Sequence, residues 1–215
     1  MREYYDRRAA EYDEWYMGTG LFAARERPGW HEEVAALCDA IAALPVKTTL
    51  DVACGTGFLT RHLNGSVACL DQSERMLGIA AERMPSARIV RTEALPLPFA
   101  DGAFERVFTG HFYGHLRPGE REQFLAEAAR VAAELVVVDS RERPDHAAEE
   151  EQERILNDGS VHRVFKRYFT GPELAAELVG GEVLFDGDWF VMARRRRLTP
   201  LALCSATQPR RDRSA

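Results

Sequence analysis

The feature that most constrains this chain is the ten-residue stretch LDVACGTGFL at positions 50–59. The apolar and β-branched residues at 48–53 predict a buried strand. Gly55 and Gly57 predict a tight turn, because a residue without a Cβ atom tolerates positive φ and lets a ligand approach the backbone. Apolar residues then recur at a helical spacing, so we expect a helix over residues 56–64. In an open α/β sheet, ligands bind where such a strand ends and such a helix begins.

Two known nucleotide-binding loops do not fit this stretch. A dinucleotide-binding G-x-G-x-x-G fingerprint needs a third glycine where this chain has Thr60, and the phosphate-binding pattern G-x-x-x-x-G-K-[ST] does not occur. The remaining pattern, D-x-A-C-G-T-G from Asp51 to Gly57, resembles motif I of the class I S-adenosylmethionine-dependent methyltransferases. The resemblance implies an enzyme with S-adenosylmethionine as its cofactor. The alternative is an unrelated strand-to-helix turn that contains glycines.

Strands and helices alternate through the middle of the chain. We expect strands at 47–53, 67–70, 87–91, 104–109 and 135–139, and helices at 30–44, 73–84 and 118–133. This alternation predicts right-handed crossovers and a parallel sheet. The pair Asp186-Gly187 between two apolar runs predicts a tight hairpin, so the last strand must be antiparallel. The expected fold is an α/β, Rossmann-like, seven-stranded sheet, mostly parallel with an antiparallel last strand, which is the fold that the resemblance implies.

The region after the fifth strand is harder to interpret. Residues 141–158 are highly charged, and we expect an exposed helix in their middle. Residues 161–169 are expected to be extended or irregular. Thr170 and Glu173 form a capping-box pattern that predicts a helix as far as Val179.

The N-terminal segment holds too many aromatic residues for a loose tail. Tyr5, Tyr12 and Tyr16 are spaced as on one face of a helix, which can simply cover an edge of the core. The resemblance implies a second role, a lid that closes over the cofactor. We therefore expect one domain over residues 1–193, with a helical lid and first helix at 1–45 and a core at 46–193. A basic tail at 194–215 follows.

Composition narrows the range of partners and locations. The net charge of −6 argues against a general affinity for nucleic acid, which needs a basic surface. The sequence has no apolar run of membrane-spanning length and no apolar segment typical of a signal peptide. Its four cysteines form no C-x-x-C pair, so we expect reduced cysteines and a cytoplasmic location.

The resemblance also assigns roles to the ends of the strands. It implies that Asp51 accepts from the ammonium group of the cofactor and that Asp71 accepts from both ribose hydroxyls. Asp71 can alternatively be a charge at the helix N-terminus before Ser73. Glu93 is expected to meet the adenine amino group. The full predicted cofactor set is Tyr12, Asp51, Ala53, Gly55, Gly57, Asp71, Gln72, Met76, Glu93, Ala94 and Thr109.

Candidate residues for proton removal follow the fourth strand. His111 is our candidate general base, because an imidazole titrates near neutral pH. It can instead hydrogen-bond the backbone in a strand-to-helix turn. Tyr113 is expected to orient the acceptor and His115 to face the following helix. His111 and His115 have no evident third partner for a metal ion, so we expect no metal site.

These residues predict methyl transfer to a small molecule, with oxygen as the expected acceptor atom. The strand-four loop reads Thr-Gly-His-Phe, not the Asn/Asp-Pro-Pro-Tyr motif of the family members that methylate amide nitrogens of nucleic acids and proteins. The alternatives are a tRNA or protein methyltransferase and a non-catalytic module that binds S-adenosylmethionine.

Overall fold

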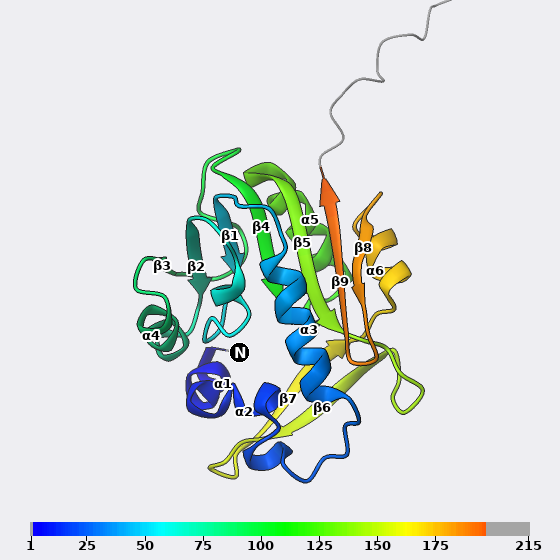
Figure 1. Ribbon diagram of the computed structural model, residues 1–215. Coiled ribbons are helices and arrows are strands. Elements are labelled where there is room, and N and C mark those ends of the chain that lie inside the picture. Colours follow the sequence, from blue (N-terminus) through cyan, green and yellow to red (C-terminus); the bar gives the residue numbers. More distant parts are fainter. Residues whose placement is uncertain (1, 197–215) are drawn as a thin grey trace, which may run out of the picture.

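A seven-stranded sheet forms the centre of the computed structural model, which describes residues 2–196 (Figure 1). The strand order is β3-β2-β1-β4-β5-β9-β8. Pairs from β3 to β5 are parallel, and β9 is antiparallel to both β5 and β8. The predicted fold is therefore confirmed. The strands are β1 (Thr49–Val52), β2 (Val67–Asp71), β3 (Arg88–Arg91), β4 (Phe104–Gly110), β5 (Ala132–Ser140), β8 (Glu182–Asp186) and β9 (Phe190–Arg196).

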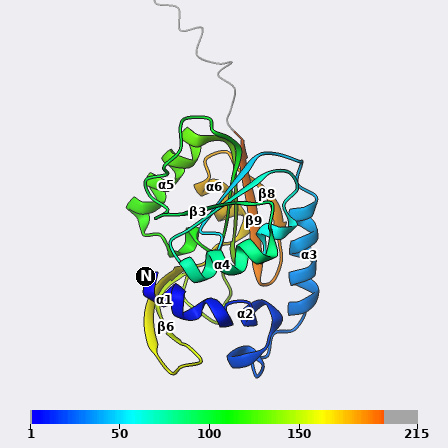
Figure 2. The ribbon, with the colours of Figure 1, turned by 90° about the vertical axis from the view of Figure 1, so that its left-hand side faces the viewer.

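Helices cover both faces of this sheet (Figures 1 and 2). Helix α3 (Trp30–Ala42) lies on one face, and α5 (Pro118–Val131) and α6 (Gly171–Glu177) lie on the other. The alternation of side chains along a strand explains both layers, since Val136 and Val138 pack on the α3 side and Val137 on the α5 side. Helix α4 (Glu74–Arg83) packs beside β2 and β3. None of the helices within residues 2–196 has the length and apolar content of a transmembrane segment.

Local turn and cap chemistry is as the sequence predicts. Ser73 Oγ accepts from Met76 N at 3.2 Å and begins α4. Thr170 and Glu173 cap each other's backbone at the start of α6. Gly187 N donates to Phe190 O at 2.9 Å and closes the hairpin between β8 and β9.

The predicted helix over residues 56–64 is wrong, because only a 3₁₀ turn at Thr60–His62 forms there. Leu63 is already extended, and Lys47 N donates to Asn64 O at 3.3 Å. At Gly65, with φ of +108°, a Cβ atom would lie 2.2 Å from Lys47 O. The chain must therefore turn tightly past the start of β1 to enter β2, which leaves no length for an α-helix.

The predicted exposed helix within residues 141–158 is also wrong. Residues Glu149–Ile155 form strand β6, which pairs antiparallel with β7 (Val161–Arg167) in a separate two-stranded sheet. Its side chains alternate between exposed and half-buried, which is the period of a strand. Opposite charges meet across the pair, Glu149 with Arg167 and Glu153 with Arg163. These cross-strand ion pairs help to stabilise β6, although the high charge of this segment led us to expect an exposed helix.

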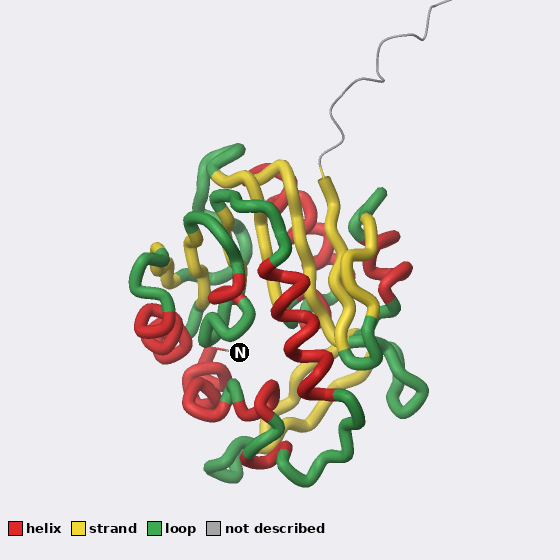
Figure 3. The backbone as a smooth tube through the Cα atoms, viewed as in Figure 1, coloured by secondary structure: helices red, strands yellow, loops and turns green. Residues whose placement is uncertain are grey.

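The N-terminal segment is a chain of short turns where we expected one helical face. It comprises α1 (Arg2–Arg8), a 3₁₀ turn, α2 (Glu14–Met17) and a second 3₁₀ turn. Gly18, with φ of +65°, ends α2. Together with the β6–β7 hairpin, these turns lie beyond the ends of the parallel strands where β4 and β5 finish (Figure 3). The aromatic segment and the charged segment are thus neighbours in space.

Strand β9 extends to Arg196, three residues past the predicted end of the domain. Arg194 Nε donates to Glu182 Oε1 at 2.6 Å, and Arg196 Nε lies 3.4 Å from Glu134 Oε2. These acidic partners keep residues 194–196 in the sheet, so they do not belong to the expected tail. The rest of that tail, 197–215, lies outside the described residues.

The buried ion pair between β4 and β5 gives a test of this packing. Arg106 Nε donates to Glu134 Oε1 at 2.6 Å, and both side chains are about 1% exposed or less. We predict that Glu134→Ala lowers the free energy of unfolding by about 3–5 kcal/mol, because it leaves an uncompensated buried charge. The control Glu153→Ala removes an exposed pair and should cost at most about 1 kcal/mol. Urea unfolding of both variants checks this, and equal losses would contradict it.

Candidate active site

The glycine turn after β1 has the backbone that its sequence predicts. Ala53, Gly55 and Gly57 all have positive φ, at 59°, 56° and 73°. A Cβ atom at Gly57 would lie 2.5 Å from Met84 Cε, so α4 packs directly on the turn. A Cβ atom at Gly55 would meet the ring of Tyr12 at 3.4 Å. The Tyr12 ring therefore covers the backbone at Gly55, and a ligand that replaced the ring would contact this backbone directly.

Asp51 has a free acceptor atom beside this turn. Its Oδ2 accepts from Thr60 Oγ1 at 2.5 Å, whereas its buried Oδ1 has no hydrogen-bond partner among the described residues. Burial raises the pKa of Asp51 to about 8, and the nearby Asp71 adds to the effect. Asp51 lines a small cavity together with Tyr12, Ala53 and Gly110. An unpaired carboxylate oxygen here is suited to a cationic donor, so the site fits the ammonium group of S-adenosylmethionine.

Asp71 links the glycine turn to the start of α4. Its Oδ2 accepts from Gly55 N at 3.0 Å and its Oδ1 from Ser73 N at 2.8 Å. Burial raises its pKa, although these amides and the Gln72 amide act in the opposite direction. Each carboxylate oxygen has a second lone pair, so the amide contacts leave acceptor capacity for a vicinal diol. The two roles expected for Asp71 are compatible in this geometry.

The N-terminal segment lies directly on the glycine turn. Asp13 accepts from Thr56 Oγ1 and pairs with Arg83 Nη2, both at 2.5 Å. The ring of Tyr16 stacks on Phe58 with centroids 4.0 Å apart. These contacts place aromatic side chains where a ligand of the turn would enter.

The remaining predicted cofactor residues are spread over the neighbouring elements. Gln72 is half-buried and Met76 is fully buried at the start of α4. Thr109 is also buried and donates to Val52 O at 2.8 Å, so its hydroxyl is occupied. Glu93 is exposed in the loop after β3, and Ala94 packs on the core. Asp51, Ala53 and Tyr12 line one small cavity, whereas Gln72, Met76, Glu93, Ala94 and Thr109 do not line it.

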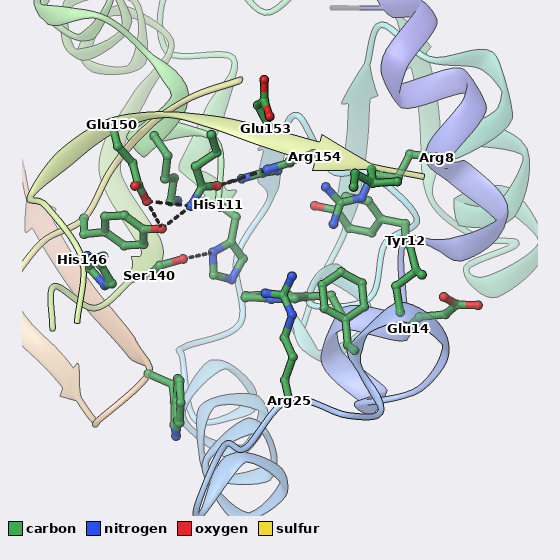
Figure 4. A pocket seen from close by; sticks show the side chains of 18 of the residues that line it. Arg8, Tyr12, Glu14, Arg25, His111, Ser140, His146, Glu150, Glu153 and Arg154 are labelled. Atoms are coloured by element: carbon green, nitrogen blue, oxygen red, sulfur yellow. Dashed lines mark hydrogen bonds between the residues drawn. The ribbon is translucent and has the colours of Figure 1, made fainter. Parts of the chain in front are cut away.

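His111 stands at the end of β4 with φ of 57° and is 9% exposed. Its backbone N donates to Val138 O at 2.8 Å, and its ring meets the edge of Trp15 with centroids 4.8 Å apart. In Figure 4, Nδ1 faces Ser140 Oγ, 3.4 Å away. Nε2 is buried and has no partner in the part of the chain that the structure describes. Burial lowers the pKa of His111, and Asp139 only partly offsets this.

Asp139, at the end of β5, is the residue that sequence reasoning missed. It lies 3.8 Å from His111 Nδ1, accepts from Gly114 N at 2.7 Å, and binds Lys166 Nζ. Burial alone raises the pKa of Asp139, but Lys166 and His111 reverse this and hold it far below the usual range. Two signals were available in the sequence. Asp139 ends a strand as Asp51 and Asp71 do, and Lys166 is one of only two lysines.

Two expectations about the strand-four loop do not fit the structure. Tyr113 is buried in the core against Phe169, and its hydroxyl donates to Glu177 Oε2 at 3.1 Å, so its ring does not face the pocket. His115 does not face the following helix. Its Nδ1 lies 2.6 Å from Phe165 O in β7, and burial lowers its pKa well below the ordinary value.

A pocket of about 950 Å³ adjoins His111 (Figure 4). It lies between the N-terminal segment, the ends of β4 and β5, and the β6–β7 hairpin. Its walls include Trp15, Trp30, Ser140, Lys166 and Tyr168. Within residues 2–196, no three His, Cys, Asp or Glu residues are grouped so that they can hold a metal ion. The buried imidazole of His111 makes acid–base chemistry available at this pocket.

Comparison with known proteins finds a family match in the sheet and a similar fold. Residues 49–134 match the family described as "Methyltransferase domain", a range that contains the glycine turn and runs from β1 to the start of β5. The fold matches a solved structure described as "DhpI-SAM-HEP complex", with a TM-score of 0.70 and 23% identity over 89% of this chain and 94% of that one. Residues 49–134 therefore carry a methyltransferase domain, and the likeness to the solved structure shows that this chain shares its fold.

The relatives found by sequence comparison are also named methyltransferases. An uncharacterized methyltransferase of Alkaliphilus oremlandii is 26% identical over 167 residues, 75% of each chain. A demethylmenaquinone methyltransferase of Shouchella clausii is 30% identical over 132 residues. The matched segment is 56% of this chain and 54% of that relative, so this chain spans about half of its length. These relatives support the class and leave the acceptor of this chain to be argued from its own site.

The raised pKa of Asp51 leads to a prediction for stability. The folded protein keeps a proton on Asp51 up to about pH 8, whereas an ordinary carboxyl releases it near 3.8. The contribution of Asp51 is thus most favourable at low pH and is progressively lost as the pH rises towards 8. We expect Asp51→Asn to melt several degrees above the parent at pH 8, with a smaller gap at pH 5, since about 1 kcal/mol corresponds to about 2–4 °C.

Thermal unfolding of ligand-free protein at both pH values measures this gap. The exposed Asp188→Asn serves as the control and should show no such dependence. If the difference in melting temperature between Asp51→Asn and the parent were the same at pH 5 and pH 8, the raised pKa of Asp51 would be contradicted.

Proposed function

We propose that this enzyme methylates an oxygen atom of a small molecule bound in the pocket beside His111. The observation that carries the proposal is the buried Nε2 of His111, which has no partner among the described residues and belongs to a side chain that lines the pocket. A base at this position can take the proton of an acceptor hydroxyl. That the reaction takes place in the cytoplasm stays a prediction.

The chain's own groups supply proton removal and orientation. When bound, S-adenosylmethionine supplies an electrophilic methyl group whose thioether leaving group needs no proton. We assign to His111 Nε2 the acceptance of the hydroxyl proton as the oxygen forms its bond to the methyl carbon. We assign Asp139 as a positioning residue, because its carboxylate lies 3.8 Å from Nδ1, where it would favour the proton on that nitrogen and stabilise the imidazolium that results.

The cofactor roles proposed for the strand ends follow from their free acceptors. Asp51 Oδ1 would accept from the cofactor ammonium, and Asp71 from the ribose hydroxyls. The N-terminal segment, with Tyr12 against Gly55 and Trp15 against His111, would act as the lid. Because these rings cover both the glycine turn and the base, the lid must move for ligands to enter and would exclude water when it closes.

Cofactor binding tests the first part of the proposal. Calorimetry should show S-adenosylhomocysteine binding and no NAD binding. Gly55→Val should abolish it, because a branched side chain at positive φ is strained and fills the approach to the turn. Gly119→Val is the control, since a Cβ atom there meets nothing within 4 Å. Unchanged binding by Gly55→Val would remove the glycine turn from the site.

Replacing the base tests the second part. His111→Asn keeps a residue that tolerates positive φ but removes the imidazole. With an acceptor found by screening hydroxylated small molecules, we expect turnover to fall by about 100-fold while S-adenosylhomocysteine affinity is unchanged. The parent rate should rise with pH through an apparent pKa below 6.5, in line with the lowered pKa of His111, and the variant should lack this limb.

The control for this substitution is His162→Asn. His162 packs on Tyr4 with ring centroids 5.0 Å apart and does not line the pocket. A small loss in His111→Asn, or a loss that follows cofactor affinity, would show that His111 is not the base.

A further inference from the structure

Most of the charged side chains that line the pocket already have partners. Lys166 pairs with Asp139, Arg143 with Asp145, and Arg141 with Asp186. Among the acidic residues, Glu151 pairs with Arg117 and Glu153 with Arg163. Glu150 accepts from Tyr168 and Gln152, and Glu11 and Glu14 accept from Asn157.

Arg25 and Arg27 line the pocket and have no carboxylate partner among the described residues. Arg8 and Arg154 share that state but, unlike those two, donate to one common acceptor atom. Neither has a carboxylate within 4 Å among residues 2–196, although Arg8 is only 8% exposed and Arg154 is half-buried. Arg8 lies over the rings of Tyr4 and Tyr12, at 5.7 and 5.1 Å from their centroids. Arg154 donates to Gln152 Oε1 at 2.9 Å through Nη2. Both guanidinium groups are therefore held by neutral groups only.

The two arginines meet at one atom. Nη1 of Arg8, from α1, and Nη1 of Arg154, from β6, both donate to the hydroxyl oxygen of Tyr4, the second at 3.4 Å. Figure 4 shows both side chains reaching into the pocket, with Arg154 between Arg8 and His111. Two guanidinium cations that share one phenol oxygen repel each other. An oxyanion placed between them would neutralise the pair.

We propose that the methyl acceptor carries an anionic group, a carboxylate or a phosphoryl-type oxyanion, which Arg8 and Arg154 bind on the side of the pocket away from His111. This inference rests on the proposed function and adds the substrate class. The planar guanidinium matches the paired oxygens of such groups. Both arginines line the same pocket as His111, so an acceptor held by its anionic group can present a hydroxyl of the same molecule to Nε2.

Simple anions test the site in the full-length protein. S-adenosylhomocysteine is bound first, which examines the proposed function independently. Inorganic phosphate, acetate and choline are then titrated at constant ionic strength by calorimetry. We expect phosphate or acetate to bind and choline not to bind. A response to phosphate alone would identify a phosphoryl group, and a response to acetate would identify a carboxylate.

Three variants and one control decide whether the arginines are responsible. Arg8→Gln and Arg154→Gln should each weaken anion binding by about tenfold or more while S-adenosylhomocysteine still binds, a loss typical of one charge-assisted contact. Arg154→Lys should restore part of the affinity, which shows that the site is folded. Arg163→Gln removes a charge from the same hairpin at an exposed position and should leave binding unchanged.

Two results would overturn the inference. One is equal anion affinity in the parent and in Arg154→Gln, and the other is binding of choline with no anion binding, which would assign the pocket to a cation. Because S-adenosylhomocysteine binding is measured in the same samples, its absence would instead count against the proposed function.

Discussion

The carboxylate of Asp139 is the contact on which the architecture of the site depends. It accepts from the amide of Gly114 in the loop after β4, from its neighbour Ser140, and from Lys166 on β7. Because these donors come from separate parts of the chain, one buried charge joins the sheet, the strand-four loop and the hairpin. Removing a partner from such a pair leaves an uncompensated charge in the interior. The position of His111 is thus linked to the attachment of β7.

Three aspartates end parallel strands at this edge of the sheet, and their surroundings give each a different state. Asp51 has an oxygen without a partner, and burial raises its pKa to about 8. Asp71 accepts from two backbone amides. Asp139 faces a lysine and a histidine, which outweigh burial and lower its pKa. The same residue type at equivalent positions therefore differs in charge state and in free acceptor atoms according to its surroundings.

Local chemistry in the sequence was sufficient to predict the sheet. The cap at Ser73, the box at Thr170 and the turn at Asp186-Gly187 each depend on residues within four positions of one another. The errors concern interactions between distant residues. Strand β6 pairs with β7, whose opposite charges meet its own, and Lys166 meets Asp139 across 27 residues. Arg8 and Arg154 are 146 positions apart in sequence, so no motif could indicate their meeting at Tyr4.

The β6–β7 hairpin pairs only with itself, apart from the sheet that carries the glycine turn. The family match at 49–134 ends before this hairpin begins, and Arg8 lies before it starts. The two segments that line the large pocket, the N-terminal segment and the β6–β7 hairpin, therefore lie outside the matched range, and the seven-stranded sheet is complete without them. Such a division lets evolution exchange the hairpin and the N-terminal segment while the sheet order stays fixed. Divergence of acceptors among related enzymes is then expected to concentrate in these two segments.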